Sequence, residues 1–412
     1  MRKVAGLATV SAVALAGIVY AAGGGGGSVT GSGAVLLPSA KSGVAASAAA
    51  TPAAAAPGSN IPDSWICVFK AGAVARGAEQ GEANKVVGKA GGRIGHVYRY
   101  ALQGFSISLP AQAAASVAAH NPNIAYCEAD QIATVIDPVN TLARPGGGGG
   151  GTSTETTPAG ITSIGGGTAT YTGTGRAFVI DSGIDLTHPD LNVDTALSRN
   201  FVSRETSPND LNGHGSHVAG TIAAKKGNSI GVVGVAPGAK LIAVRVLDRR
   251  GSGAYSDVIA GVDYVASIGG LGDVANMSLG GPVSDALDQA VINASTSSKV
   301  LFALAAGNET DDANNHSPAR ADGPYILTVA AVNSTDTFAS FSNYSVINDP
   351  VDFAEPGVSI LSTWKDGGYN TISGTSMATP HLAGLVLLGG PRATTRLSTA
   401  APNGVRFPIG VK

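Results

Sequence analysis

The chain has 412 residues, of which 44% are hydrophobic and 13% are charged, and its formal net charge at pH 7 is -2. This length allows one large α/β domain together with something smaller, and it is far above that of a minimal module. A charge so low and so nearly balanced argues against nucleic acid or an anionic membrane surface as a partner.

The first predicted element is an export signal over residues 1–22. Two basic residues, Arg2 and Lys3, precede a largely apolar run that ends in small residues near Ala22. The run is at the long end for a signal peptide, so a retained membrane anchor is the open alternative. In both cases the protein is expected to be exported, and to act outside the cell or at its surface.

A Gly/Ala/Ser/Pro-rich segment over residues 23–59 predicts a flexible, low-complexity tether. Residues 60–135 then predict a small domain in which strands and helices follow the order βαββαβ, which is typical of a ferredoxin-like α+β fold. The strands are expected over residues 65–70, 93–100, 104–109 and 124–128, and the helices over 78–90 and 111–119.

The chain has two cysteines, Cys67 and Cys127, and both lie in this small domain. In an exported protein a pair of cysteines can form one disulfide. The sequence leaves this open against two buried free thiols.

Residues 136–155 contain Asp-Pro, Arg-Pro and a run of glycines, and they predict an exposed linker with a processing site. From residue 156 to residue 412, apolar strand-like runs alternate with helical patterns. This alternation predicts an α/β domain with a mostly parallel sheet and helices on both faces. The strands are expected over residues 177–180, 241–246, 274–278, 300–305 and 326–332, and the helices over 214–224, 256–268, 284–296 and 376–388.

Polar residues follow three of the predicted strands: Asp181, the segment 278–280 and Asn308. Ligands of such sheets bind at the carboxyl ends of strands, so these residues are candidates for a site. Two further motifs open helices, Asn-Gly-His-Gly-Ser-His around His214 and Gly-Thr-Ser-Met-Ala around Ser376.

Together these residues predict acyl-transfer chemistry. A serine hydroxyl such as that of Ser376 becomes a nucleophile when a histidine, here His214, takes its proton. A carboxylate such as Asp181 fixes the tautomer of that histidine and stabilises its positive charge. The oxyanion formed by attack needs donors, which the side-chain amide of Asn308 and the backbone N–H of Ser376 can supply.

The motifs around Asp181, His214, Asn308 and Ser376 resemble those of the subtilisin-like serine peptidases over about residues 157–384. Three more segments are especially similar to the proteinase K branch, at residues 276–281, 341–344 and 360–364. The resemblance implies that Asp181, His214 and Ser376 are the catalytic triad, and that Asn308 is the oxyanion-hole asparagine. It implies a secreted serine endopeptidase that acts through an acyl-enzyme and is made as an autoprocessed zymogen.

The resemblance also identifies residues 60–135 as an inhibitor-type propeptide, which would help the slow-folding parallel sheet to form and then cover the cleft until it is cut away. The implied partners are protein and peptide substrates and the protein's own propeptide. A monomer without nucleic acid or an organic cofactor is expected.

Substrate binding in this family resembles β-augmentation, in which an extended peptide pairs with exposed backbone edges. The resemblance implies six substrate-binding residues: Ser278, Leu279 and Gly280 on one edge, Gly253 and Tyr255 in the segment 251–255 on the other edge, and Ala319. The segment 317–319 resembles the floor of the primary pocket and carries no charge, which predicts apolar or aromatic side chains before the cut bond. Arg320 and Asp322, close by in sequence, count against that preference.

Structural calcium is implied by the same resemblance, because hard cations prefer carboxylate, amide and carbonyl oxygens. Asp190 and Asn228 match ligands of one family site. Asp352, with backbone oxygens near Pro324 and Ile326, resembles a second site of the proteinase K branch. The alternative is ordinary loop chemistry, in which Asp and Asn are common.

Other histidines are expected to be structural. His217 and His381 lie on apolar helices and His188 in a loop, and the spacing of His214 and His217 lacks the pattern of a zinc site. The Gly-rich segment 172–175 precedes its strand, which is the wrong side for a phosphate cradle.

Two departures from the family pattern affect the expectations. Ser216 replaces the usual threonine, and the chain after Leu388 is short, so the helix that carries Ser376 is expected to be less well covered. Two further functions stay open: an inactive subtilisin-like binding protein, and a tethered surface protein that uses the Gly/Ala segment as a spacer.

Overall fold

The computed structural model describes residues 58–135, 154–346 and 350–412. The predicted export signal, nearly all of the low-complexity segment and most of the linker lie outside these residues. Within the described residues, no helix is both long and apolar enough to cross a membrane.

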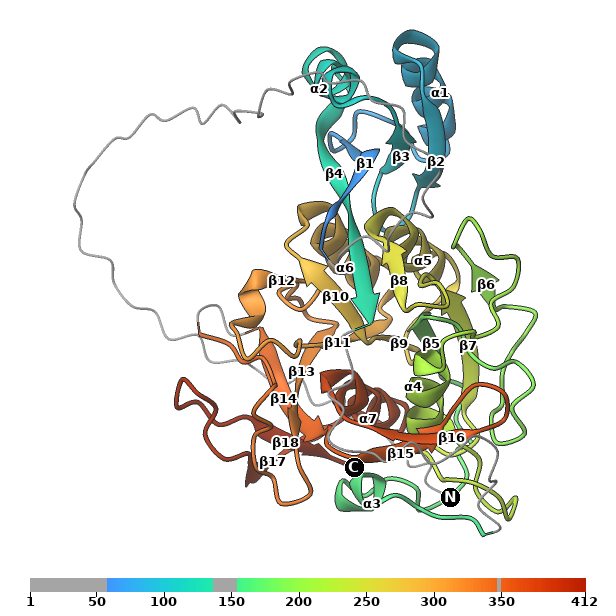
Figure 1. The fold of residues 1–412 in the computed structure, drawn as a ribbon, viewed down its shortest axis with the longest axis vertical. Coiled ribbons are helices and arrows are strands. Elements are labelled where there is room, and N and C mark those ends of the chain that lie inside the picture. Colours follow the sequence, from blue (N-terminus) through green and yellow to red (C-terminus); the bar gives the residue numbers. More distant parts are fainter. Residues whose placement is uncertain (1–57, 136–153, 347–349) are drawn as a thin grey trace, which may run out of the picture. The chain divides into compact units, whose positions relative to one another are not determined.

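The N-terminal domain has the predicted βαββαβ order (Figure 1). Its strands form an antiparallel sheet in the order β4-β1-β3-β2. The elements are β1 (Asn60–Phe69), α1 (Glu79–Ala90), β2 (Arg93–Tyr98), β3 (Gly104–Ser108), α2 (Ala111–His120) and β4 (Ile124–Val135). Its core brings Phe69 and Phe105 from adjacent strands together with Val86 of α1 and Val117 of α2.

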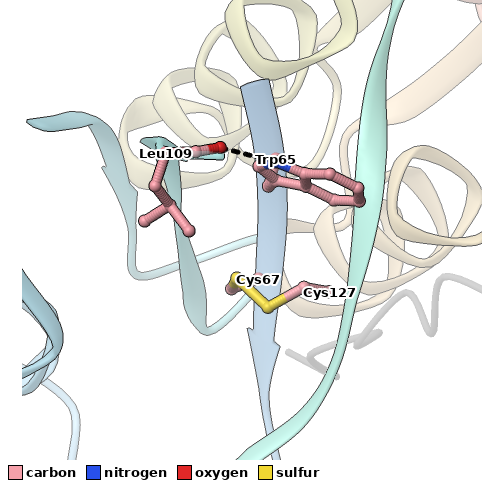
Figure 2. Close-up of a disulfide and its surroundings, with 4 residues drawn as sticks. All are labelled: Trp65, Cys67, Leu109 and Cys127. Atoms are coloured by element: carbon pink, nitrogen blue, oxygen red, sulfur yellow. Dashed lines mark hydrogen bonds between the residues drawn. A yellow bond between two sulfur atoms is a disulfide. The ribbon is translucent and has the colours of Figure 1, made fainter. Parts of the chain in front are cut away.

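A disulfide joins the first and last strands of this domain, which decides between the two alternatives left by the sequence. Cys67 on β1 and Cys127 on β4 are directly opposite residues of the antiparallel pair, and their sulfur atoms lie 2.00 Å apart (Figure 2). Two residues before Cys67, the indole Nε1 of Trp65 donates to the carbonyl of Leu109 at 3.0 Å (Figure 2). Through these two links β1 holds both β4 and the end of β3.

The predicted end of the last strand at residue 128 is wrong, because β4 continues to Val135. The added residues pair with strands that lie more than a hundred residues further along the chain. On one side β4 pairs antiparallel with β8 (Ser252–Ala254), and on the other side with β10 (Leu279–Pro282). The apolar pattern of neighbouring residues carries no information about these distant hydrogen-bond partners, so it does not predict the extension of β4.

The C-terminal part of the chain contains a parallel sheet in the order β14-β13-β11-β9-β5-β7-β6. All five predicted strands are present in it, and β6 and β14 were not predicted. The strands are β5 (Arg176–Asp181), β6 (Arg199–Asn200), β7 (Lys240–Arg245), β9 (Val274–Met277), β11 (Leu301–Ala305), β13 (Ile326–Val332) and β14 (Val351–Pro356).

Helices cover both faces of this sheet, as predicted. Alternate residues of β5 show the division, since Phe178 and Ile180 pack with α5 and α6, whereas Ala177 and Val179 pack with α4 and α7. The helices are α3 (Ala159–Ser163), α4 (His214–Ala223), α5 (Tyr255–Ile268), α6 (Asp285–Ser298) and α7 (Thr375–Leu387). Smaller elements are the 3-10 turn Ala313–Asn315, β12 (His316–Ser317), β15 (Ile360–Thr363) and β16 (Tyr369–Ile372).

The residues after Leu388 are folded and pack against α7. They form an antiparallel hairpin of β17 (Arg392–Leu397) and β18 (Pro408–Val411). Phe407 and Ile409 are buried here and share a core cluster with Leu385 of α7 and Ala354 of β14. The expectation that α7 would be poorly covered is therefore wrong, because two large apolar side chains of the hairpin complete the packing around its C-terminal half.

Candidate active site

The carboxyl end of the central strand β5 carries Asp181, which is fully buried. Its backbone carbonyl accepts hydrogen bonds from Val246 and Leu247, which fix the end of the strand against the segment after β7. The side chain accepts from the backbone N–H of Ser182 at 2.6 Å. Strand and side chain are thus both held, and the carboxylate can accept a further donor.

That donor is His214, the first residue of α4. Its Nδ1 lies 2.9 Å from each carboxylate oxygen of Asp181. The His214 side chain is 2% exposed and that of Asp181 0%, so the pair is sequestered from water. An imidazole held in this way keeps its proton on Nδ1, which leaves Nε2 as the basic nitrogen.

The residue that positions His214 was missed by the sequence analysis. Asp210 is buried, and its Oδ1 accepts the backbone N–H groups of Asn212 and Gly213 at 2.9 Å. Its Oδ2 accepts the backbone N–H and the hydroxyl of Ser216 at 2.9 and 2.7 Å. Burial raises the pKa of Asp210, and these hydrogen bonds oppose the rise. A carboxylate just before a helix start is a capping signal that could have identified it.

Ser376 lies in the first turn of α7, which packs against α4 and against β9, β11 and β13. Its hydroxyl donates to the carbonyl of Ser278 at 3.2 Å, and its own carbonyl accepts from the Ser278 hydroxyl at 2.9 Å. The serine predicted as nucleophile and the first residue of the predicted substrate edge are therefore direct neighbours. His214 begins α4, and Ser376 lies at the N-terminal end of α7. The two helices are in contact (Figure 1).

Asn308 follows β11 and reaches the same helix start. Its Oδ1 accepts from the backbone N–H and the hydroxyl of Thr375 at 2.9 and 3.0 Å. This fixes the amide with its Nδ2 toward Gly374, where a Cβ would lie 3.0 Å from Nδ2. Gly374 has a φ of 159° and no side chain, so the amide can approach the backbone of the turn closely.

The two predicted substrate edges lie on either side of β4. Ala133 of β4 is opposite Gly253 of β8, and Thr134 is opposite Gly280 of β10. The backbone N–H of Val135 donates to the carbonyl of Gly251 at 2.7 Å. The last residues of the N-terminal domain thus run as an extended strand between the edges expected to bind substrate (Figure 1).

The primary-pocket residues border a cavity of about 430 Å³ next to this strand. Leu279, Gly280 and Ala319 line it, together with Ala305 and Ala306. Tyr255 does not line this cavity: its ring is fully buried at the start of α5, and its hydroxyl donates to the carbonyl of Pro282 at 2.7 Å. In this state of the protein Tyr255 supports β10.

The structure brings the first pair of predicted metal ligands together. Asn228 donates from Nδ2 to Oδ1 of Asp190 at 2.7 Å, and Val232 donates its backbone N–H to Oδ2 at 3.0 Å. Glu155, which the sequence analysis did not name, accepts the backbone N–H groups of Gly227 and Asn228. Two carboxylates and an amide around one loop are hard oxygen donors of the kind that suits calcium.

Asp352, the third predicted metal ligand, lies apart from this loop on β14. Its Oδ2 accepts from the backbone N–H of Thr328 at 2.9 Å, which places it beside β13 near Ile326. No group of three or more His, Cys, Asp or Glu side chains in a metal-binding arrangement occurs in the described part of the chain. The structure thus shows one carboxylate at this place, held by the backbone N–H of Thr328.

The three histidines expected to be structural, His217, His381 and His188, are held by backbone carbonyls. His217 is fully buried and its Nε2 contacts the carbonyl of Ile360 at 2.9 Å, and burial lowers its pKa to about 3. His381 contacts the carbonyl of Met377 from Nδ1, and burial lowers its pKa to about 4. His188 contacts the carbonyl of Gly368 from Nε2. The buried, neutral imidazoles of His217 and His381 are suited to packing.

Comparison with known proteins agrees with the site. Residues 178–389 match peptidase S8, the subtilase family. The chain belongs to this family and is a subtilisin-like serine endopeptidase by class.

Three relatives illustrate the similarity. The chain is 50% identical to alkaline serine exoprotease A of Vibrio alginolyticus over 222 residues, which are 53% of this chain and 39% of that protein. It is 40% identical to subtilisin NAT of Bacillus subtilis subsp. natto over 311 residues, 74% of each chain. It is 41% identical to an extracellular serine proteinase of Thermus sp. over 314 residues, 75% of this chain and 71% of that one.

Proposed function

We propose that the protein is a secreted endopeptidase that hydrolyses peptide bonds through Asp181, His214 and Ser376. The observation that carries the proposal is the buried pair of Asp181 and His214, with Nδ1 2.9 Å from both carboxylate oxygens. His214 is the first residue of α4, and α4 packs on α7, the helix of Ser376. The similarity to relatives named as extracellular proteinase and exoprotease supports export.

In the proposed reaction, His214 takes the proton of the Ser376 hydroxyl through Nε2 while the hydroxyl attacks the substrate carbonyl. The bond between carbonyl carbon and serine oxygen forms, and the imidazolium is stabilised by the buried carboxylate of Asp181. His214 then gives the proton to the leaving amine, and an acyl-enzyme remains on Ser376. Water activated by the same histidine hydrolyses this ester.

The oxyanion formed in each step would be bound by Nδ2 of Asn308 and the backbone N–H of Ser376. The hydrogen bonds from Thr375 to Oδ1 hold the Asn308 amide in one orientation before substrate arrives. Donors that are already oriented need no rearrangement in the transition state, and removing one typically costs about 3 kcal/mol.

The N-terminal domain would act as an inhibitory propeptide. Its strand β4 occupies both backbone edges, since residues 132–135 pair with β8 and β10. A substrate that binds by β-augmentation needs the same hydrogen-bond donors and acceptors. Activity would therefore require cleavage after this strand, in the linker at residues 136–155, followed by loss of the domain.

Two carboxylates of β4 also bind helix starts of the peptidase, which supports a role in folding. Asp130 accepts from the backbone N–H and the hydroxyl of Ser256 in the first turn of α5. Glu128 accepts from the hydroxyl of Ser284 and the backbone N–H of Ala286 at the start of α6. The unpaired N–H groups of a helix start favour a carboxylate, so these contacts would stabilise α5 and α6 while the sheet assembles.

The cleft would favour apolar or aromatic side chains before the cut bond, because Leu279, Ala305, Ala306 and Ala319 form apolar walls of the cavity. Calcium would be held by Asp190 and Asn228, with Glu155 close by. A second ion would be held by Asp352 with backbone oxygens of the chain before β13. At both sites calcium would stabilise the fold by cross-linking the segments that carry its ligands.

Ser376→Ala tests the proposal. The variant is expected to lose both release of the N-terminal domain and hydrolysis of casein, because the nucleophile is gone. Ser163→Ala, at an exposed serine of α3, is the matched control and should retain both. If Ser376→Ala processed itself and hydrolysed casein at the rate of the unchanged protein, the enzymatic role would be refuted, in favour of a binding protein.

A further inference from the structure

A buried arginine lies at the carboxyl end of β7, next to the strand that carries Asp181. Arg245 is the last residue of β7 and is directly opposite Asp181 in the parallel pair of β5 and β7. Its side chain is only 1% exposed, and the proposed reaction does not use its charge. Burying a charged group is costly unless it is paired and hydrogen-bonded, so the partners of this guanidinium indicate its role.

The guanidinium of Arg245 binds the chain that leads into α4. Its Nη1 donates to the carbonyls of Ser207 and Asn209 at 3.1 and 2.9 Å. Glu205 of the same segment supplies a negative charge, with Oε1 3.4 Å from Nη2. Nε donates to the carbonyl of Leu247, two residues further along the chain, at 3.2 Å. The arginine therefore links the end of β7 to the segment before α4.

The peptide unit between Asn209 and Asp210 is held from two sides. Its carbonyl accepts from Arg245, and its N–H, which belongs to Asp210, donates to the carbonyl of Ile184 at 3.0 Å. A peptide unit is planar, so holding both its polar ends fixes its orientation. Asp210 therefore starts from a fixed backbone, and its carboxylate accepts N–H groups that precede and follow His214.

The neighbouring cation is placed differently. Arg249 also approaches Glu205, at 3.5 Å, but its side chain is 67% exposed. An exposed ion pair is weak because water and salt screen it. On the side of β7, the segment before α4 is therefore held mainly by the buried guanidinium of Arg245 and not by this surface pair.

We infer that Arg245 is a positioning residue for His214: its guanidinium fixes the peptide unit between Asn209 and Asp210, and Asp210 in turn fixes the start of α4. The inference rests on the proposed endopeptidase function. Without the guanidinium, the carbonyls that it binds lose a charged donor, and the segment shifts. A displacement of about 1 Å can lower a rate by about 100-fold, so a misplaced His214 would take the Ser376 proton less efficiently.

Arg245→Met tests this inference in the enzyme that has processed itself. Labelling to completion with phenylmethylsulfonyl fluoride, a reagent for active-site serines, counts the folded sites, so that kcat refers to these sites alone. We expect kcat to fall by about 3- to 30-fold and KM to stay within about twofold, because the chemical step is slowed and the substrate edges are untouched. Arg245→Lys keeps the charge and can donate to both carbonyls, so it should recover most of kcat. Arg245→Gln keeps an amide donor and is the milder change if Arg245→Met does not fold.

A double variant separates this role from a general loss of stability. If Arg245 acts through Asp210, adding Arg245→Met to Asp210→Ala should lower kcat by less than about twofold further. Arg176→Met is the matched control, since Arg176 begins β5 at the end opposite Asp181 and is paired with Asp273 at 2.6 Å. This control should lower Tm and leave kcat per labelled site unchanged.

Two results would overturn the inference and leave the proposed function intact. One is an unchanged kcat per labelled site in Arg245→Met, or in Arg245→Gln where only that variant folds. The other is an equal fold-loss of kcat with and without the Asp210 side chain. An unchanged chain that is not labelled at Ser376 and cleaves no peptide would overturn the proposed function instead.

Discussion

Asp263 of α5 binds the N-terminal domain through a single oxygen atom. Its Oδ1 accepts the backbone N–H groups of three consecutive residues, Arg99, Tyr100 and Ala101, at 2.9, 2.6 and 2.8 Å. Burial raises the pKa of Asp263 and these three bonds oppose the rise. The loop after β2 is thus fastened to the peptidase far in sequence from the strand that occupies the cleft.

Asp263→Ala should loosen this fastening. The variant is made in the full chain with Ser376→Ala, so that the N-terminal domain stays attached. Loss of hydrogen bonds to a charged group should lower the free energy of opening of the loop at residues 99–101 by about 2 kcal/mol, which corresponds to roughly thirtyfold faster hydrogen exchange. Hydrogen exchange at the amides of residues 99–101 measures it. Asp322→Asn, at an exposed carboxylate, should leave exchange unchanged. Equal protection in both variants would show that this contact does not hold the domain.

The disulfide gives a second prediction. Cys67 and Cys127 are 60 residues apart in sequence, so their link removes much loop-closure entropy from the unfolded domain. Replacing both with serine, again with Ser376→Ala, should destabilise the N-terminal domain by about 2–4 kcal/mol. Denaturant unfolding followed by the fluorescence of Trp65 measures the change. Reduction with dithiothreitol should make the cysteine-containing protein behave like the double variant, and no shift on reduction would contradict the prediction.

The positioning role of Asp210 can be separated from the chemistry. Asp210→Ala removes the acceptor for four backbone or hydroxyl donors around the start of α4, so His214 should lose its fixed orientation. The expected result is a kcat lower by about 10- to 100-fold with a smaller change in KM. Asp210→Asn retains one acceptor oxygen and should recover part of kcat. An unchanged kcat in the alanine variant would remove Asp210 from the site.

Glu355 predicts a dependence of stability on pH. This side chain is fully buried on β14, its Oε1 accepts the backbone N–H of Gly410, and burial raises its pKa well above the ordinary value of 4.5. Because the folded state keeps the proton that the unfolded state loses, the stabilisation is complete below pH 4.5 and declines as pH rises toward the folded pKa. Glu355→Gln, which is always neutral, should therefore gain in Tm relative to the unchanged chain as pH is raised. A Tm difference that is constant with pH would contradict this assignment.

Calcium binding at Asp190 gives the last prediction. A chelator should lower the Tm of the unchanged protein, because an ion bound only by the folded state stabilises it. Asp190→Ala should have a lower Tm that the chelator no longer changes. Identical melting with and without chelator in the unchanged protein would rule the site out.

Sequence alone determined the order of the main helices and strands and the residues of the proposed chemistry. Local patterns are sufficient for this, because the period of apolar residues marks each strand and helix, and the short motifs around Asp181, His214 and Ser376 mark their ends. The four helices and five strands predicted after residue 156 are all present, with ends that differ by a few residues at most.

Tertiary structure alone decided where distant segments meet. Strand β4 extends to Val135 only because β8 and β10 supply its hydrogen-bond partners. Glu309, Asp311 and His316 carry no motif, and only the fold places them around one cavity. The C-terminal hairpin looked too short to cover α7, and it does so because Phe407 and Ile409 fill the space beside it. Each of these results depends on contacts between residues far apart in sequence, which a local pattern does not encode.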